Sequence, residues 1–229
     1  TRYSGSGDVK SVSLRTPQLT KPVNVAAANL AFEADRIRLE NVNASIGPLH
    51  ATGFVSIRDF ERPNIEFQAS TNELNVAELR GLAASGGAGK DDSESLLRKV
   101  TAKGAITANR LVAEEIVLAP VRATVSLQAG QLRLDPVTAG LFGGQQTGSI
   151  TADLNRTPAV YQISTRIANV EANKLLSATT PVENVLYGLL GGNLDVRFVG
   201  QKDRLAPSLN GVARIEMGEG RLAGVNLVN

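Results

Sequence analysis

Leu194-Asp195-Val196-Arg197-Phe198 alternates apolar and charged side chains at every position, and this stretch decides the fold. Successive side chains of an extended strand point to opposite faces, so the alternation predicts a strand with one apolar and one polar face. The same two-residue period recurs along the chain, notably in residues 65–70, 121–127 and 212–217. Such a chain is typical of an antiparallel sheet that is apolar on one face and wetted on the other.

The composition predicts an all-β fold, mainly antiparallel and built from repeated β-hairpins. The 229 residues include 22 glycines, and 42% are hydrophobic. Turn sequences such as Ala34-Asp35-Arg36 and Ala129-Gly130-Gln131 separate apolar runs, as hairpin turns do. We therefore expect about a dozen strands of ordinary length, forming either a curled sheet with a groove or a sandwich-like core. A few short helices should accompany them, among them residues 173–177 and 182–190.

An internal repeat appears at an offset of 95 residues. Ile37-Arg38-Leu39 matches Leu132-Arg133-Leu134, and the pairs Gly53/Gly148 and Pro63/Pro158 lie at the same offset. Duplication or the general needs of a β-meander would produce such matches, and the shared glycines and prolines favour duplication. The repeat predicts a first β unit over residues 1–82 and a second over residues 96–229, which also holds the start of a further hairpin. A flexible Gly/Ser/Asp-rich linker over residues 83–95 is expected between them.

The composition argues against several classes of function. The net charge is only +2 with scattered basic residues, so a nucleic-acid surface is not expected. There is no cysteine and His50 is the sole histidine, which leaves no usual metal-ligand set. No Gly-x-Ser-x-Gly sequence is present, and the 86–90 run lacks the residues of a phosphate-binding loop. We expect no enzyme activity, no catalytic residue, no cofactor and no metal.

Two segments carry a family resemblance. Residues 132–144 (LRLDPVTAGLFGG) lead to Gly148, Pro158 and then residues 167–176 (IANVEANKLL). Residues 209–211 (LNG) lead to residues 218–227 (GEGRLAGVNL). In this order and spacing the segments resemble the C-terminal region of the AsmA family, with Phe142 where the family often has tyrosine. The likeness is good from about Leu96 onward and weaker over residues 30–79.

The resemblance implies a non-catalytic periplasmic segment of a protein involved in outer-membrane assembly and integrity. The protein would be anchored to the inner membrane through a segment outside this chain. The resemblance also implies kinship with bridge-like lipid transfer proteins, in which phospholipid acyl chains occupy a hydrophobic β-groove. Phospholipid is therefore the expected partner. The alternative is a structural or partner-binding β scaffold that binds no lipid.

The apolar side chains of the alternating segments are the candidate site. Neighbouring strands share a face, so these side chains should form one surface, and the sequence leaves open whether it is a closed core or an open lipid groove. The candidate lipid-facing or core residues are Val125, Leu127, Leu132, Leu134, Leu194, Val196, Phe198, Ala213, Ile215 and Met217.

Overall fold

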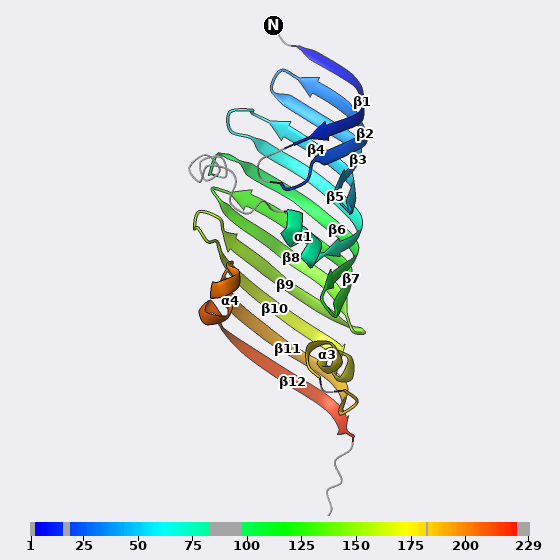
Figure 1. Ribbon diagram of the computed structural model, residues 1–229, viewed down its shortest axis with the longest axis vertical. Helices are drawn as coiled ribbons and strands as arrows, with labels where there is room; N and C mark the ends of the chain where they lie inside the picture. The colour runs from blue at the N-terminus through cyan, green and yellow to red at the C-terminus, as the bar shows by residue number, and fades with distance from the viewer. Residues whose placement is uncertain (1–2, 16–18, 83–97, 182, 224–229) are drawn as a thin grey trace, which may run out of the picture.

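The computed structural model describes residues 3–15, 19–82, 98–181 and 183–223, and these residues form one twelve-stranded sheet (Figure 1). The strands follow one another in the sheet in the order of the chain. They are β1 (Ser4–Leu14), β2 (Val23–Glu33), β3 (Arg36–Ile46), β4 (Leu49–Arg58), β5 (Asn64–Asn75), β6 (Thr101–Ala113), β7 (Ile116–Gln128), β8 (Gln131–Leu141), β9 (Gly144–Asp153), β10 (Val160–Glu171), β11 (Leu186–Val199) and β12 (Asn210–Leu222). The all-β prediction is confirmed, and the arrangement is a single curled sheet rather than a sandwich.

Three short helices accompany the described strands: α1 (Val76–Leu82), α3 (Ala172–Thr179) and α4 (Lys202–Ser208). The helix predicted at residues 173–177 is confirmed as part of α3. The helix predicted at residues 182–190 is wrong, because β11 already begins at Leu186. Pairing with β10 and β12 outweighs the helix-like spacing of its leucines, and Gly188, Gly191 and Gly192 are poor helix formers.

All neighbouring strands are antiparallel except β5 and β6, which run parallel. Asn64 at the start of β5 pairs with Thr101 at the start of β6, so the chain returns along the whole strand length between them. The linker predicted at residues 83–95, and the 86–90 run within it, lie outside the described residues. The division into two units therefore stays a prediction, although the sheet itself passes without a break from β5 to β6.

Bends in the middle of the strands give the sheet its curl. The pairing shifts between Leu39 and Val42 and again between Ile167 and Val170, where Asn41 and Asn169 adopt left-handed φ angles of 51° and 57°. Shifts in β7 and β8 flank Pro120 and Pro136, which lack the N–H that a ladder requires. Such irregularities bend a strand and increase its twist. They occur in strands spread from β3 to β10, and the strands of the sheet curve together (Figure 1).

The apolar face lies on the inside of this curl. Leu111 and Leu118, beyond the bend, pack against the buried side chains of Ala108, Val121 and Ala139 before it. No second sheet covers this face among the described strands. The accessible surface is 15123 Å², about half as much again as the roughly 10,000 Å² expected of a compact protein of this length. The sheet is therefore an open layer with a small core at its bend.

The 95-residue repeat is visible in the architecture. Gly53 on β4 pairs with Val42 of β3, and Gly148 on β9 pairs with Val137 of β8. Pro63 lies one residue before β5 and Pro158 two residues before β10, and helices α1 and α3 follow these two strands. The units diverge after the helix, because β6 lies parallel to β5 whereas β11 lies antiparallel to β10.

Replacing the two equivalent glycines should weaken the fold to the same extent. A Cβ on Gly53 would overlap the carbonyl oxygen of Gln68, and one on Gly148 would overlap that of Ser164. We expect Gly53→Ala and Gly148→Ala each to lower the free energy of unfolding by about 2 kcal/mol, measured by urea denaturation. Gly7→Ala is the control, because no atom lies within 4 Å of its added Cβ. A Gly53→Ala variant as stable as the parent chain would contradict the close approach of β4 and β5.

Candidate functional site

Apolar residues on the inner face line up across every strand of the sheet. Direct cross-strand partners point to the same face, so the pairings can be followed from β1 to β12. The first cross-strand row contains only apolar residues: Gly7, Leu30, Leu39, Val55, Phe67, Gly104, Val125, Leu134, Ile150, Ile163, Val196 and Gly211. Nine of these residues carry an apolar side chain and three are glycines, so the band of apolar side chains runs from β2 to β11, with the Phe67 ring lying over Gly104 of β6.

A second cross-strand row lies beside the first and spans β1 to β11. It too consists of apolar and aromatic residues, so the band is at least two side chains wide. Its members are Gly5, Phe32, Ile37, Ile57, Ile65, Ala102, Leu127, Leu132, Ala152, Tyr161 and Phe198.

The structure places all ten sequence-predicted candidates on this inner face. Six of them belong to the two rows: Val125, Leu134 and Val196 to the first, and Leu127, Leu132 and Phe198 to the second. The other four lie farther toward the bend. Leu194 pairs with Ala213, while Ile215 and Met217 pair with Gly192 and Leu190.

Exposure of this face rises toward β12. Val125 in β7 is 8% exposed, Leu194 in β11 is 37% exposed and Ile215 in β12 is 67% exposed. In a closed core, the large apolar side chains of this face would be buried on every strand. This face is instead buried in the middle of the sheet and open to solvent toward its end, as surfaces that bind apolar partners are.

Aromatic rings lie over glycines on the inner face, a feature that sequence reasoning missed. A Cβ on Gly104 would come within 2.6 Å of the Phe67 ring, and one on Gly5 would come equally close to the Phe32 ring. Each ring therefore covers the neighbouring strand where that strand has no side chain. The signal in the sequence is weak, because the glycine and the ring belong to strands whose pairing is not apparent from either segment alone.

A polar pair, Gln146 and Thr165, lies on the inner face near the bend. Gln146 lies between Ala139 and Ile167 on adjacent strands, and its Nε2 donates to Thr165 Oγ1 at 2.7 Å. Gln146 Oε1 is buried and has no hydrogen-bond partner among the described residues. Nothing in the alternating pattern singled out this residue.

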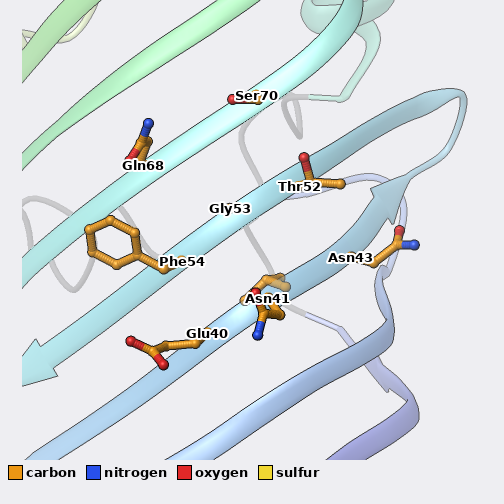
Figure 2. A pocket seen from close by; sticks show the side chains of 9 residues that line it. Glu40, Asn41, Asn43, Thr52, Gly53, Phe54, Gln68 and Ser70 are labelled. Atoms are coloured by element: carbon orange, nitrogen blue, oxygen red, sulfur yellow. The ribbon is translucent and has the colours of Figure 1, made fainter.

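The outer face is polar and is hollowed around Gly53. Figure 2 shows this hollow, the Gly53 notch, which is lined by Glu40, Asn43, Thr52, Gly53, Phe54 and Gln68 among others and has a volume of about 640 Å³. The side chains come from β3, β4 and β5. Most of them are uncharged hydrogen-bonding groups, in contrast to the inner face.

The described residues supply no recognisable catalytic or metal-binding group. His50 is exposed on β4 opposite Ser45, and the described acidic and histidine side chains form no group of three that could hold a metal ion. Where the chain is described, no helix has the length and apolar character needed to cross a bilayer.

The Asp153 carboxylate accepts several hydrogen bonds at the turn between β9 and β10. Desolvation raises the pKa of this carboxyl, but hydrogen bonds from the Asn155 backbone, Arg156 and Gln131 outweigh that effect, so the pKa lies below its ordinary value. Arg156 Nε lies 2.9 Å from Asp153 Oδ2, and Gln131 Nε2 lies 2.8 Å from Oδ1. The carboxylate therefore holds the turn between β9 and β10.

Comparison with protein-family models finds that the model of the AsmA family matches residues 16–229. No curated protein matches the sequence.

A tryptophan placed on the inner face should report its openness, because the chain has no native tryptophan. Phe67→Trp puts the reporter on the inner face of β5, and Phe54→Trp puts one on the outer face of β4. Acrylamide should quench both variants in buffer, because neither face is sealed. Micelles of dodecyl maltoside should shift only the Phe67→Trp emission to shorter wavelength. Emission from Phe67→Trp that acrylamide cannot quench would show that the face is closed.

Proposed function

The chain belongs to the AsmA family, and we propose that its inner apolar face binds the acyl chains of phospholipids. Family membership suggests a role in the cell envelope, and lipid binding is the form of that role which the face supports best. The carrying observation is the first cross-strand row, which places an apolar side chain on nine of the twelve strands, has glycine on the other three and stays partly exposed.

The dimensions suit acyl chains. Twelve strands at a spacing of about 4.8 Å make the row roughly 50 Å long. One leaflet of a bilayer contributes about 15 Å of hydrocarbon, so the row would hold several acyl chains in succession. Covering the row with lipid removes apolar surface from water, which favours binding by about 25 cal/mol for each Å² buried.

The proposed setting follows from the family. The chain acts in the periplasm and is held at the inner membrane through a segment outside residues 1–229. Bound phospholipid then takes part in assembly or maintenance of the outer membrane. The chain's own contribution is non-catalytic, because acyl chains need only an apolar surface shielded from water.

A second candidate function is a scaffold that binds another protein through the same face. The exposure of β12 favours it, since Ile215 is 67% and Met217 is 38% exposed on the inner face at the edge of the sheet. Protein interfaces also use exposed apolar patches. Lipid content distinguishes the two functions.

The direct experiment is mass spectrometry of lipids extracted from the purified chain. The proposal expects phospholipid at a stoichiometry well above that of a control protein purified from the same cells. Chain that is free of lipid, and that acquires none from phosphatidylethanolamine vesicles, would refute the proposal and favour the scaffold.

A charge on the inner face should abolish lipid binding without unfolding the chain. Val196→Asp places a carboxylate in the first cross-strand row, beside Ile163. Water reaches this open face, so the charge stays hydrated and the melting temperature should fall by only a few degrees. Co-purifying lipid should fall severalfold, because an acyl chain would have to desolvate the carboxylate.

Gln162→Asp is the matched control, because Gln162 is exposed on the outer face of the neighbouring strand. It adds the same charge and should leave lipid content unchanged. A folded Val196→Asp variant that carries as much lipid as the parent would rule out this row as the site. Complete unfolding of Val196→Asp would instead indicate a sealed core.

A further inference from the structure

The Gly53 notch on the outer face recurs at the equivalent place in the second unit. Pairing of Thr52 with Ser70, and of Phe54 with Gln68, frames Gly53 in the first unit. Pairing of Thr147 with Arg166, and of Ser149 with Ser164, frames Gly148 in the second. This second notch has a volume of about 380 Å³ and is also lined by Asp135. The hollow therefore belongs to the repeated architecture.

Both notches keep the same ion pair at one side. Arg38 Nε lies 2.7 Å from Glu40 Oε1, and Arg133 forms the equivalent pair with Asp135. The pairs lie 95 residues apart in the chain, in β3 and β8. An exposed ion pair adds little stability, so its recurrence is not explained by stability alone.

The two notches differ in the side chains that would touch a ligand. The first has Phe54 and Gln68 where the second has Ser149 and Ser164, and Ser70 where the second has Arg166. Phe54 is an aromatic ring on an otherwise polar face (Figure 2), with the Arg38 guanidinium 5.5 Å from its centroid. Only the first notch thus combines an apolar ring with amides and hydroxyls.

We propose that the Gly53 notch binds a neutral sugar ring, with Phe54 against the apolar face of the ring and Asn43, Thr52 and Gln68 bonded to its hydroxyls. These three polar side chains make no hydrogen bond to another described residue. Amides and hydroxyls both donate and accept, as sugar hydroxyls do. An aromatic wall with a few polar groups that fix orientation is the usual composition of a small-ligand site.

A phosphate or other anion fits this notch less well. Its one nearby guanidinium, on Arg38, is already paired with Glu40, and Glu40 itself would repel an anion. A sugar has no charge to neutralise and tolerates both members of the pair. The site lies on the face opposite the proposed lipid surface, so the two binding functions are separable.

Saturation-transfer NMR on the full chain with maltose, cellobiose and N,N′-diacetylchitobiose tests the proposal. At least one of these neutral disaccharides should receive saturation from the chain and show a dissociation constant in the millimolar range. Phe54→Ser, which gives the first notch the residue of the second, should weaken that binding about fivefold. Ser149→Ala in the second notch is the control and should leave it unchanged.

Several outcomes would overturn the proposal. No transfer to any of the three sugars would show a solvated hollow without a ligand of this class. Equal binding by the parent and Phe54→Ser would place any sugar contact elsewhere. If circular dichroism shows that Phe54→Ser is unfolded, Gln68→Ala carries the test, because Gln68 is an exposed side chain whose removal leaves the sheet intact. Undiminished binding by a folded Gln68→Ala variant would then reject the site. Val196→Asp should not alter sugar binding, which keeps this result independent of the lipid proposal.

Discussion

The register between neighbouring strands is the constraint on which the rest of the structure depends. Side chains alternate between faces, so a slip of one residue at any pairing would turn a whole strand over. In β11 such a slip would bring Asp195 and Arg197 to the inner face and expose Val196 and Phe198 on the outer one. Each of the eleven successive strand pairings joins two residues of the first row, so every member of that row lies on the inner face. Binding along the sheet needs this agreement, since one inverted strand would place charges across the path.

The curvature of the sheet also shapes the inner face. It arises where the strict alternation of side chains between the two faces is interrupted. Where Asn41 and Asn169 take left-handed angles, two apolar residues three positions apart both reach the inside of the bend. The small core of Ala108, Val121 and Ala139 forms between these two positions, in β6, β7 and β8. A single layer with its core at the bend leaves the rest of its apolar face without a covering layer. Under the proposed function, acyl chains would cover that face.

The 95-residue repeat predicted from the sequence joins regular backbone features to differing side chains. The backbone features persist in both units, with glycine at the close approach of two strands and proline before the next strand. The outer-face side chains have diverged, so Phe54 faces solvent where the second unit has Ser149. The inner face stayed apolar in both units. The side chains at this offset are therefore more alike on the inner face, where both members are apolar, than on the outer face.

The sequence by itself determined the fold class, the hairpin turns and the face to which each alternating residue belongs. Two-residue periodicity is a local property of extended chain, so Leu194, Val196 and Phe198 could be assigned to one face without any knowledge of their partners. The recurrence of Gly53 and Gly148 was equally visible, because it depends only on position along the chain. Local spacing misled at residues 182–190, where leucines at helical intervals lie in a strand that its neighbours stabilise.

Only the tertiary structure decided whether the apolar face is closed or open. That outcome depends on bends that break the two-residue period, and on pairings such as that of β5 with β6, whose residues are far apart in the chain. The polar Gln146 on the inner face, the rings lying over glycines and the Gly53 notch likewise arise where separate strands meet. Contacts between distant segments leave no periodic signal in either segment, and for that reason the sequence specified the faces of the sheet but not its shape.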